Sequence, residues 1–129
     1  RKELFIVQNL INTTGKSIYI EKEEMLNAAT AVSGSGPAYV FYFMQAMIES
    51  AVKLGFSLSE AEFLVSQTFS GSVQLQNRSK LSNEAWIQRV ASKGGTTEAA
   101  LLVFNKNELQ EIVIEGIEAA NARALELGS

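Results

Sequence analysis

The most informative segment for the architecture reads Pro37-Ala38-Tyr39-Val40-Phe41-Tyr42-Phe43-Met44-Gln45-Ala46-Met47-Ile48-Glu49-Ser50-Ala51-Val52-Lys53-Leu54-Gly55. Between positions 38 and 52 only three residues are plainly polar, namely Gln45, Glu49 and Ser50. A helix that is apolar on nearly all sides needs cover from several directions, so this one should be central. Proline suits a first helical turn and glycine a left-handed cap, which predicts a helix from about Pro37 to Leu54.

A glycine-rich joint precedes this helix. Apolar residues at helical spacing, from Met25 to Val32, stop at Ser33-Gly34-Ser35-Gly36-Pro37. The backbone amides at the start of the next helix are exposed, and the helix dipole there favours anions. A purely structural interpretation stays open, in which the glycines only permit close packing and a bend. The joint is not a dinucleotide fingerprint, because it follows a helix and lacks both the third glycine and a βαβ unit.

A second glycine loop, further along the chain, also leads into a helix and reads Ser92-Lys93-Gly94-Gly95-Thr96-Thr97. Consecutive amides at Gly95, Thr96 and Thr97 could hold a carboxylate, and a threonine hydroxyl can donate to or accept from a polar ligand atom. The alternative is an ordinary threonine cap after a Gly-Gly turn. The spacing of a Walker A loop is absent.

The remaining helical signals, together with those above, predict an all-α fold. Ser57 and Ser59 each have a glutamate three residues on, so either could open a helix that reaches about Gln76. Shorter helices are expected at residues 84–91 and 97–104. A last helix should begin after Asn107, carry one apolar stripe, and end at Gly128.

For the first 22 residues the sequence gives weaker signals for helix or strand. The run Leu4-Phe5-Ile6-Val7 is compatible with a buried strand, but the apolar spacing over residues 3–11 favours a helix. After the turn signal Asn12-Thr13-Thr14-Gly15, the short segment Ser17-Ile18-Tyr19-Ile20 is β-branched and aromatic. We therefore expect one short extended segment there, beside an otherwise helical chain.

Composition excludes several classes of function. The 129 residues are 47% hydrophobic, carry a net charge of -3 and contain no Cys and no His. The basic residues are scattered along the sequence, so they indicate no positive patch of the kind that binds nucleic acid or an anionic membrane. Thiol nucleophiles, usual zinc sites and imidazole triads are absent, so we expect no metal site. No apolar run is long enough for a membrane span, and the first residues build no secretory signal, which makes a cytoplasmic location the expectation.

The two glycine loops, in this order and at this separation, resemble those of pyrroline-5-carboxylate reductase. The residues that carry the resemblance are Ala31-Val32-Ser33-Gly34-Ser35-Gly36-Pro37-Ala38-Tyr39 and Val90-Ala91-Ser92-Lys93-Gly94-Gly95-Thr96-Thr97-Glu98-Ala99-Ala100-Leu101. The similarity extends over essentially the whole chain. In that family an N-terminal Rossmann domain binds NADPH or NADH, and a helical C-terminal domain dimerises and completes the substrate pocket.

The resemblance implies a helical dimerisation domain of the type found at the C-terminus of 6-phosphogluconate dehydrogenase. It also implies the reduction of 1-pyrroline-5-carboxylate to L-proline, the last step of proline biosynthesis. The substrate carboxylate would be held by Ser92, Gly94, Gly95, Thr96 and Thr97, and Thr97 would lie near the ring nitrogen as the catalytic residue. The segment Ser33, Gly34, Ser35, Gly36 and Pro37 would face the nicotinamide side.

The resemblance also predicts how the chain is organised. Residues 1–22 would be a lead-in helix and extended segment from a nucleotide-binding domain outside this chain, and residues 23–129 the helical domain. We expect a homodimer, with higher oligomers open, and no reductase activity from these residues alone. Two alternatives remain: a related reductase with a different imine substrate, and a non-catalytic helical assembly module.

Overall fold

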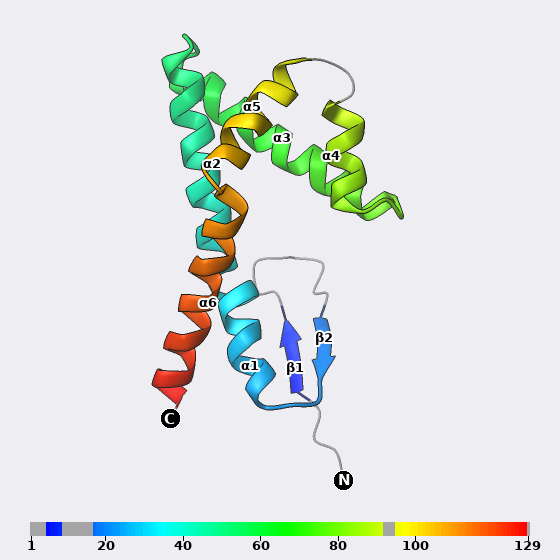
Figure 1. The fold of residues 1–129 in the computed structure, drawn as a ribbon, viewed down its shortest axis with the longest axis vertical. Coiled ribbons are helices and arrows are strands. Elements are labelled where there is room, and N and C mark those ends of the chain that lie inside the picture. Colours follow the sequence, from blue (N-terminus) through cyan, green and yellow to red (C-terminus); the bar gives the residue numbers. More distant parts are fainter. Residues whose placement is uncertain (1–4, 9–16, 92–94, 129) are drawn as a thin grey trace. The chain divides into compact units, whose positions relative to one another are not determined.

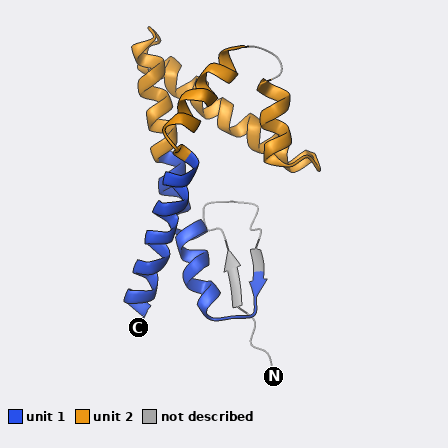
Figure 2. Ribbon diagram, in the orientation of Figure 1, with its two compact units in different colours: residues 1–41, 110–129 blue, residues 42–109 orange. Residues whose placement is uncertain are grey.

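A computed structural model describes residues 5–8, 17–91 and 95–128. The described elements, shown in Figure 1, are two strands, six α-helices and one π-helical turn. The bounds are β1 (Phe5–Gln8), β2 (Ser17–Ile20), α1 (Glu24–Ala29), η1 (Thr30–Gly34), α2 (Gly36–Lys53), α3 (Leu58–Arg78), α4 (Asn83–Ala91), α5 (Gly95–Lys106) and α6 (Leu109–Gly128). The chain divides into two compact units, residues 1–41 with 110–129 and residues 42–109 (Figure 2). The all-α prediction is confirmed apart from the two short strands.

The helix favoured for residues 3–11 was wrong, because Phe5–Gln8 forms a strand. This strand pairs antiparallel with β2, in the register Phe5 with Ile20 and Gln8 with Ser17. The extended segment at residues 17–20 is confirmed. Helical spacing and a short buried strand cannot be told apart by periodicity alone, and here pairing with a distant segment decides the conformation. The turn signal at residues 12–15 lies outside the described residues.

The first helix of the chain does not stop cleanly at the glycine joint. After α1 it continues as the π-helical turn η1, in which the Ser35 amide donates to the Thr30 carbonyl over 2.8 Å. Helix α2 then begins at Gly36, with Pro37 in its first turn as predicted. A π-turn inserts one residue into the helical register, so the chain changes course here while it keeps most of its backbone hydrogen bonds.

The end of α2 follows the sequence prediction closely. Gly55 has a φ of 115°, a left-handed conformation that glycine adopts without a steric penalty. The Phe56 amide donates to the Ala51 carbonyl over 3.1 Å, and the Gly55 amide donates to the Val52 carbonyl over 3.0 Å. This pair of bonds is the Schellman arrangement, which satisfies carbonyls that the last helical turn leaves open.

The start of α3 resolves the choice between its two candidate caps. The Ser57 hydroxyl accepts from the Glu60 amide over 3.2 Å, and the Ser57 amide donates to the Glu60 carboxylate over 2.9 Å. Ser57 is therefore the cap, and its capping box is complete. The backbone hydrogen bond from Ser57, followed by its side-chain hydrogen bond, lowers the pKa of Glu60 from its ordinary value of 4.5.

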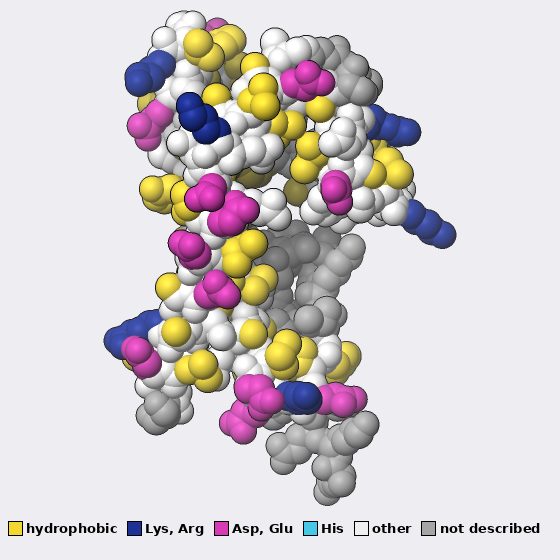
Figure 3. All heavy atoms as spheres, in the orientation of Figure 1, with side chains coloured by type: hydrophobic (Ala, Val, Ile, Leu, Met, Phe, Trp, Pro, Cys, Tyr) yellow, Lys and Arg dark blue, Asp and Glu magenta, His cyan; other side chains and the backbone are white. Residues whose placement is uncertain are grey.

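Few side chains of the described residues are buried within the chain. The buried hydrophobic residues are Ala31, Ala61, Val65 and Ala91, all small or medium in size. Along α6, hydrophobic and acidic side chains alternate on the visible surface (Figure 3), and Ile112, Val113 and Ile114 are all about half exposed. Protein domains normally bury such residues, so these helices present apolar faces that the chain itself leaves uncovered.

Candidate functional site

The first predicted site segment, residues 33–37, lies where η1 leads into α2. The Ser33 hydroxyl donates to the Ala29 carbonyl over 3.0 Å, so it stabilises the turn and is not directed to solvent. The Ser35 amide is taken by Thr30, the Ala38 amide donates to Ser35, and proline has no amide hydrogen. Gly36 is thus left as the amide at this helix start without a local acceptor, because first-turn amides have no intrahelical partner.

A groove of about 490 Å³ lies beside this segment. Its lining residues are Val32, Ser33, Gly36, Pro37, Tyr39, Val40 and Phe41. A Cβ atom added at Gly36 would meet nothing within 4 Å, so the backbone is open to approach at this point. The structure therefore brings three of the predicted residues, Ser33, Gly36 and Pro37, to one groove. Gly34 and Ser35 belong to the same turn but do not line it.

The second predicted site lies at the start of α5. Gly95, Thr96 and Thr97 form the first turn of this helix, and Ser92, Lys93 and Gly94 lie outside the described residues. The amides of a first turn point along the helix axis without intrahelical acceptors, and the helix dipole adds partial positive charge there. Gly95 and Thr96 are exposed, whereas Thr97 is half-buried. This arrangement can receive one carboxylate.

Thr97 differs from its neighbours because it lines a groove of about 720 Å³. Helices α2 to α5 contribute the lining, which is Phe43, Phe69, Ser72, Val73, Gln76, Asn83, Trp86, Ile87, Val90, Thr97 and Leu101. The Phe43 and Phe69 rings meet edge to face with their centroids 6.4 Å apart. The Gln76 side-chain amide donates to Asn83 over 2.6 Å. The lining of this groove is thus mostly apolar, and it includes the hydroxyl-bearing residues Ser72 and Thr97.

Trp86 supplies an unpaired donor in this groove. Its indole nitrogen is buried and has no hydrogen-bond partner among the described residues. The Arg89 guanidinium lies over the indole ring, 5.4 Å from its centroid, on the face of the aromatic system that attracts cations. Buried donors in native proteins are almost always satisfied, so an acceptor from outside the described residues would complete this site.

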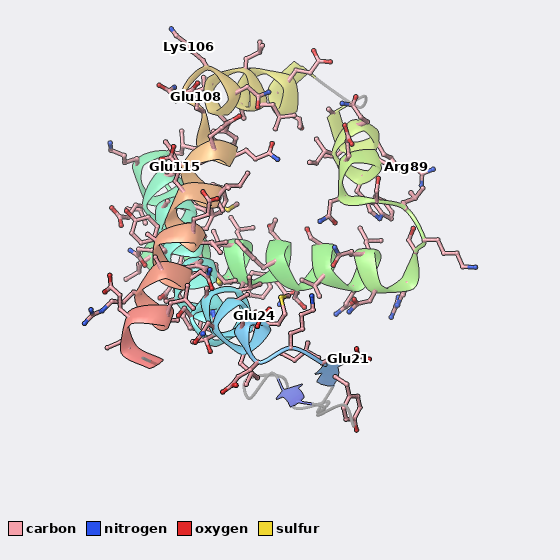
Figure 4. The ribbon with its side chains drawn as sticks, turned by 60° about the horizontal axis from the view of Figure 1, so that its bottom comes forward. Glu21, Glu24, Arg89, Lys106, Glu108 and Glu115 are labelled. Carbon is pink, nitrogen blue, oxygen red and sulfur yellow. The ribbon has the colours of Figure 1, made fainter. Side chains whose placement is uncertain are left out.

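Charged side chains lie at exposed positions on both units. Figure 4 labels Glu21, Glu24, Arg89, Lys106, Glu108 and Glu115, all at exposed positions. Glu108 sits in the tight turn between α5 and α6 with a φ of 57°, beside Asn107, whose side-chain amide donates to the Val103 carbonyl. Among the described residues, no group of three or more acidic side chains is placed to hold a metal ion.

Two residues of these sites were not identified from the sequence. Trp86 falls within the short helix expected at residues 84–91, and Tyr39 falls within the long apolar helix from about Pro37 to Leu54. A lone tryptophan gives no periodic signal, and the role of Tyr39 depends on a contact with a residue eight positions earlier. Both features become visible only when the helices are placed in space.

Comparison with known proteins gives one consistent result. The chain matches the family model described as pyrroline-5-carboxylate reductase dimerisation over residues 23–127. It is 40% identical over 118 residues to pyrroline-5-carboxylate reductase of Pseudomonas aeruginosa, covering 92% of this chain and 43% of that protein. It is 33% identical over 127 residues to pyrroline-5-carboxylate reductase 2 of Bacillus subtilis, covering 98% of this chain and 45% of that protein.

Solved structures agree with the sequence relatives. The crystal structure of Plasmodium falciparum pyrroline carboxylate reductase with NADP bound superposes with a TM-score of 0.85 at 29% identity, covering 99% of this chain and 59% of that one. The pyrroline-5-carboxylate reductase from Coxiella burnetii gives a TM-score of 0.80 at 39% identity, covering 84% of this chain and 40% of that one.

These matches place the chain among the helical domains of pyrroline carboxylate reductases. The chain belongs to the pyrroline-5-carboxylate reductase dimerisation family. It spans less than half the length of the curated relatives quoted above. Within the described residues, no helix combines the length and apolarity needed to cross a membrane.

Proposed function

We propose that this chain is the dimerisation and substrate-binding part of an oxidoreductase that reduces 1-pyrroline-5-carboxylate to L-proline with NADPH or NADH. The observation that carries the proposal is the family match over residues 23–127. It is supported by the relatives' names and by Thr97, which stands at a helix start beside a groove. In this proposal residues 23–129 form the helical domain, and residues 1–22 lead in from a nucleotide-binding domain.

Exposed apolar surface supports the homodimer. Many large hydrophobic side chains of the described residues are exposed within the chain, among them Phe41 at 61%, Ile112 at 57% and Val113 at 48%. The interfaces of obligate dimers are large and apolar. A second copy that covers α2 and α6 would remove the exposed Phe41, Ile112 and Val113 from water.

Substrate binding is assigned to the segment from Ser92 to Thr97. Amides of the first turn of α5 and nearby hydroxyls would hold the substrate carboxylate, since this helix end favours an anion. Thr97 would then direct its hydroxyl to the ring nitrogen, which must carry a proton in the product. The half-buried position of Thr97 supports this role, because a hydrogen bond shielded from water orients its partner more strongly.

The dinucleotide would be held mainly outside this chain. Its sheet of β1 and β2 is antiparallel, whereas a dinucleotide fold needs parallel strands joined through a helix. The described residues therefore do not form a complete site for NADPH or NADH. A smaller role in cofactor binding is proposed for the segment Ser33, Gly34, Ser35, Gly36 and Pro37. This segment would bring the open backbone at Gly36 toward the nicotinamide side. When bound, the cofactor supplies the hydride.

The full-length protein provides the direct test. Oxidation of NADPH or NADH should depend on added pyrroline-5-carboxylate, with L-proline as the product. The same assay with a different cyclic imine separates this proposal from a related reductase of other specificity. Absence of any imine-dependent oxidation, in a protein that folds and dimerises, would favour a helical assembly module and refute the proposal.

A further inference from the structure

Tyr39 makes a contact that spans the glycine joint. It lies in the first turn of α2, and its hydroxyl donates to the carbonyl of Ala31 over 2.8 Å. Ala31 is 1% exposed and belongs to the π-helical turn η1. The hydrogen bond therefore ties the start of α2 back to the turn that precedes it.

The π-helical register explains why this carbonyl needs a side-chain donor. In a continuous α-helix the amide of Ser35 would donate to Ala31. Here that amide donates to Thr30, one residue earlier. A buried carbonyl without a donor is destabilising, because folding removes its hydrogen bonds to water. The Tyr39 hydroxyl replaces the displaced amide.

Two other hydroxyls support the same turn from within. Thr30 donates to the Leu26 carbonyl over 2.9 Å, and Ser33 donates to the Ala29 carbonyl over 3.0 Å. Both bonds join residues four apart, so they act along the helix and do not reach α2. The Tyr39 hydroxyl, in contrast, joins the turn to the next helix. It also lines the groove beside Gly36.

We propose that Tyr39 is a positioning residue, whose hydroxyl holds η1 in its π-helical register and thereby fixes residues 33–37 along the groove. The effect on catalysis rests on the proposed function, in which this segment faces the nicotinamide side. Loss of the hydroxyl frees the Ala31 carbonyl and lets the segment move. Displacements of about 1 Å in a positioning element can lower a reaction rate by up to about 100-fold.

The test compares Tyr39→Phe with Tyr42→Phe in the full-length protein. Both changes remove one hydroxyl from α2 and keep the ring, but Tyr42 is 83% exposed and lines neither groove. Hydrogen exchange, followed by mass spectrometry on peptides that cover residues 30–36, reports the turn directly. In Tyr39→Phe the Ser35 amide should exchange about 10-fold faster, and kcat/KM should fall about 10-fold. Tyr42→Phe should change neither quantity.

Hydrogen exchange and kcat/KM together distinguish the ways in which the proposal could fail. Unchanged exchange in Tyr39→Phe would show that the hydroxyl does not hold the turn, and faster exchange with unchanged kcat/KM would remove Tyr39 from the positioning of the reaction. Exchange that rises equally across all helices would indicate general destabilisation and would also overturn the proposal. A wild-type protein without pyrroline-5-carboxylate reduction would refute the proposed function, while the exchange comparison would still decide whether Tyr39 holds the turn.

Discussion

Truncation of Phe41 tests whether a second copy covers the apolar face of α2. Phe41 is 61% exposed within the chain. A phenylalanine buries about 200 Å², so a partner that covered the exposed part would remove about 120 Å² from water. At about 25 cal/mol per Å², that burial contributes about 3 kcal/mol per copy and about 6 kcal/mol per symmetric dimer. Phe41→Ala should then weaken dimerisation by up to about 10⁴-fold.

Alanine is the suitable replacement because it favours helix and adds no charge. Sedimentation equilibrium over a range of concentrations measures the dissociation constant, with 14.1 kDa as the mass of the free chain. Gln45→Ala is the matched control on the same helix, since it removes an exposed polar side chain whose only described hydrogen bond is with Glu49. The reasoning fails if the wild-type chain sediments at 14.1 kDa, or if Phe41→Ala dimerises as tightly as Gln45→Ala.

Three further predictions concern catalysis and stability. Thr97→Ala in the full-length protein should lower kcat/KM by about 10 to 1,000-fold, and Thr97→Ser should retain most of the activity; equal rates for all three proteins would exclude the hydroxyl from the mechanism. The 129 residues alone should show no oxidation of NADPH or NADH with pyrroline-5-carboxylate above background, because the described residues form no dinucleotide fold. Ser57→Ala should destabilise α3 by about 0.5 to 2 kcal/mol in urea unfolding. Because the pKa of Glu60 is lowered in the folded state, its contribution to stability is present above about pH 4.5 and is lost as the pH falls through the folded pKa. Ser57→Ala removes the hydroxyl but keeps the Ser57 amide, which makes the larger contribution, so it should flatten the loss of stability at acid pH only in part. Glu60→Gln removes the carboxylate and should flatten this loss more completely, and an acid profile unchanged in Glu60→Gln would contradict the reasoning.

The helices could be predicted from sequence because their signals are local. A capping box, a first-turn proline and a terminal glycine act over three or four residues, so the start of α3 and both ends of α2 agree closely with expectation. Local signals left one choice open, between Ser57 and Ser59, and the hydrogen bonds to Glu60 decide it. Even for this helix cap the sequence restricted the choice to two serines.

The candidate site was predictable only in part. Glycine loops before helices drew attention to residues 33–37 and 92–97 from their composition alone. That Thr97 is half-buried and Thr96 exposed depends on which face of α5 meets the neighbouring helices. The groove that Thr97 lines draws on four helices, and no spacing within one helix encodes it.

Local signals in the sequence indicated seven helical segments, six of which are helices in the structure, together with two glycine-rich helix starts and a central helix that is apolar on nearly all sides. Tertiary structure alone decided that Phe5–Gln8 is a strand, since the pairing partner is β2. It also decided the π-helical register of η1 and the bond from Tyr39 to Ala31. The physical reason is the range of the interactions: helix caps and apolar periodicity act within a turn or two, whereas strand pairing and buried hydrogen bonds depend on which distant groups the fold brings together.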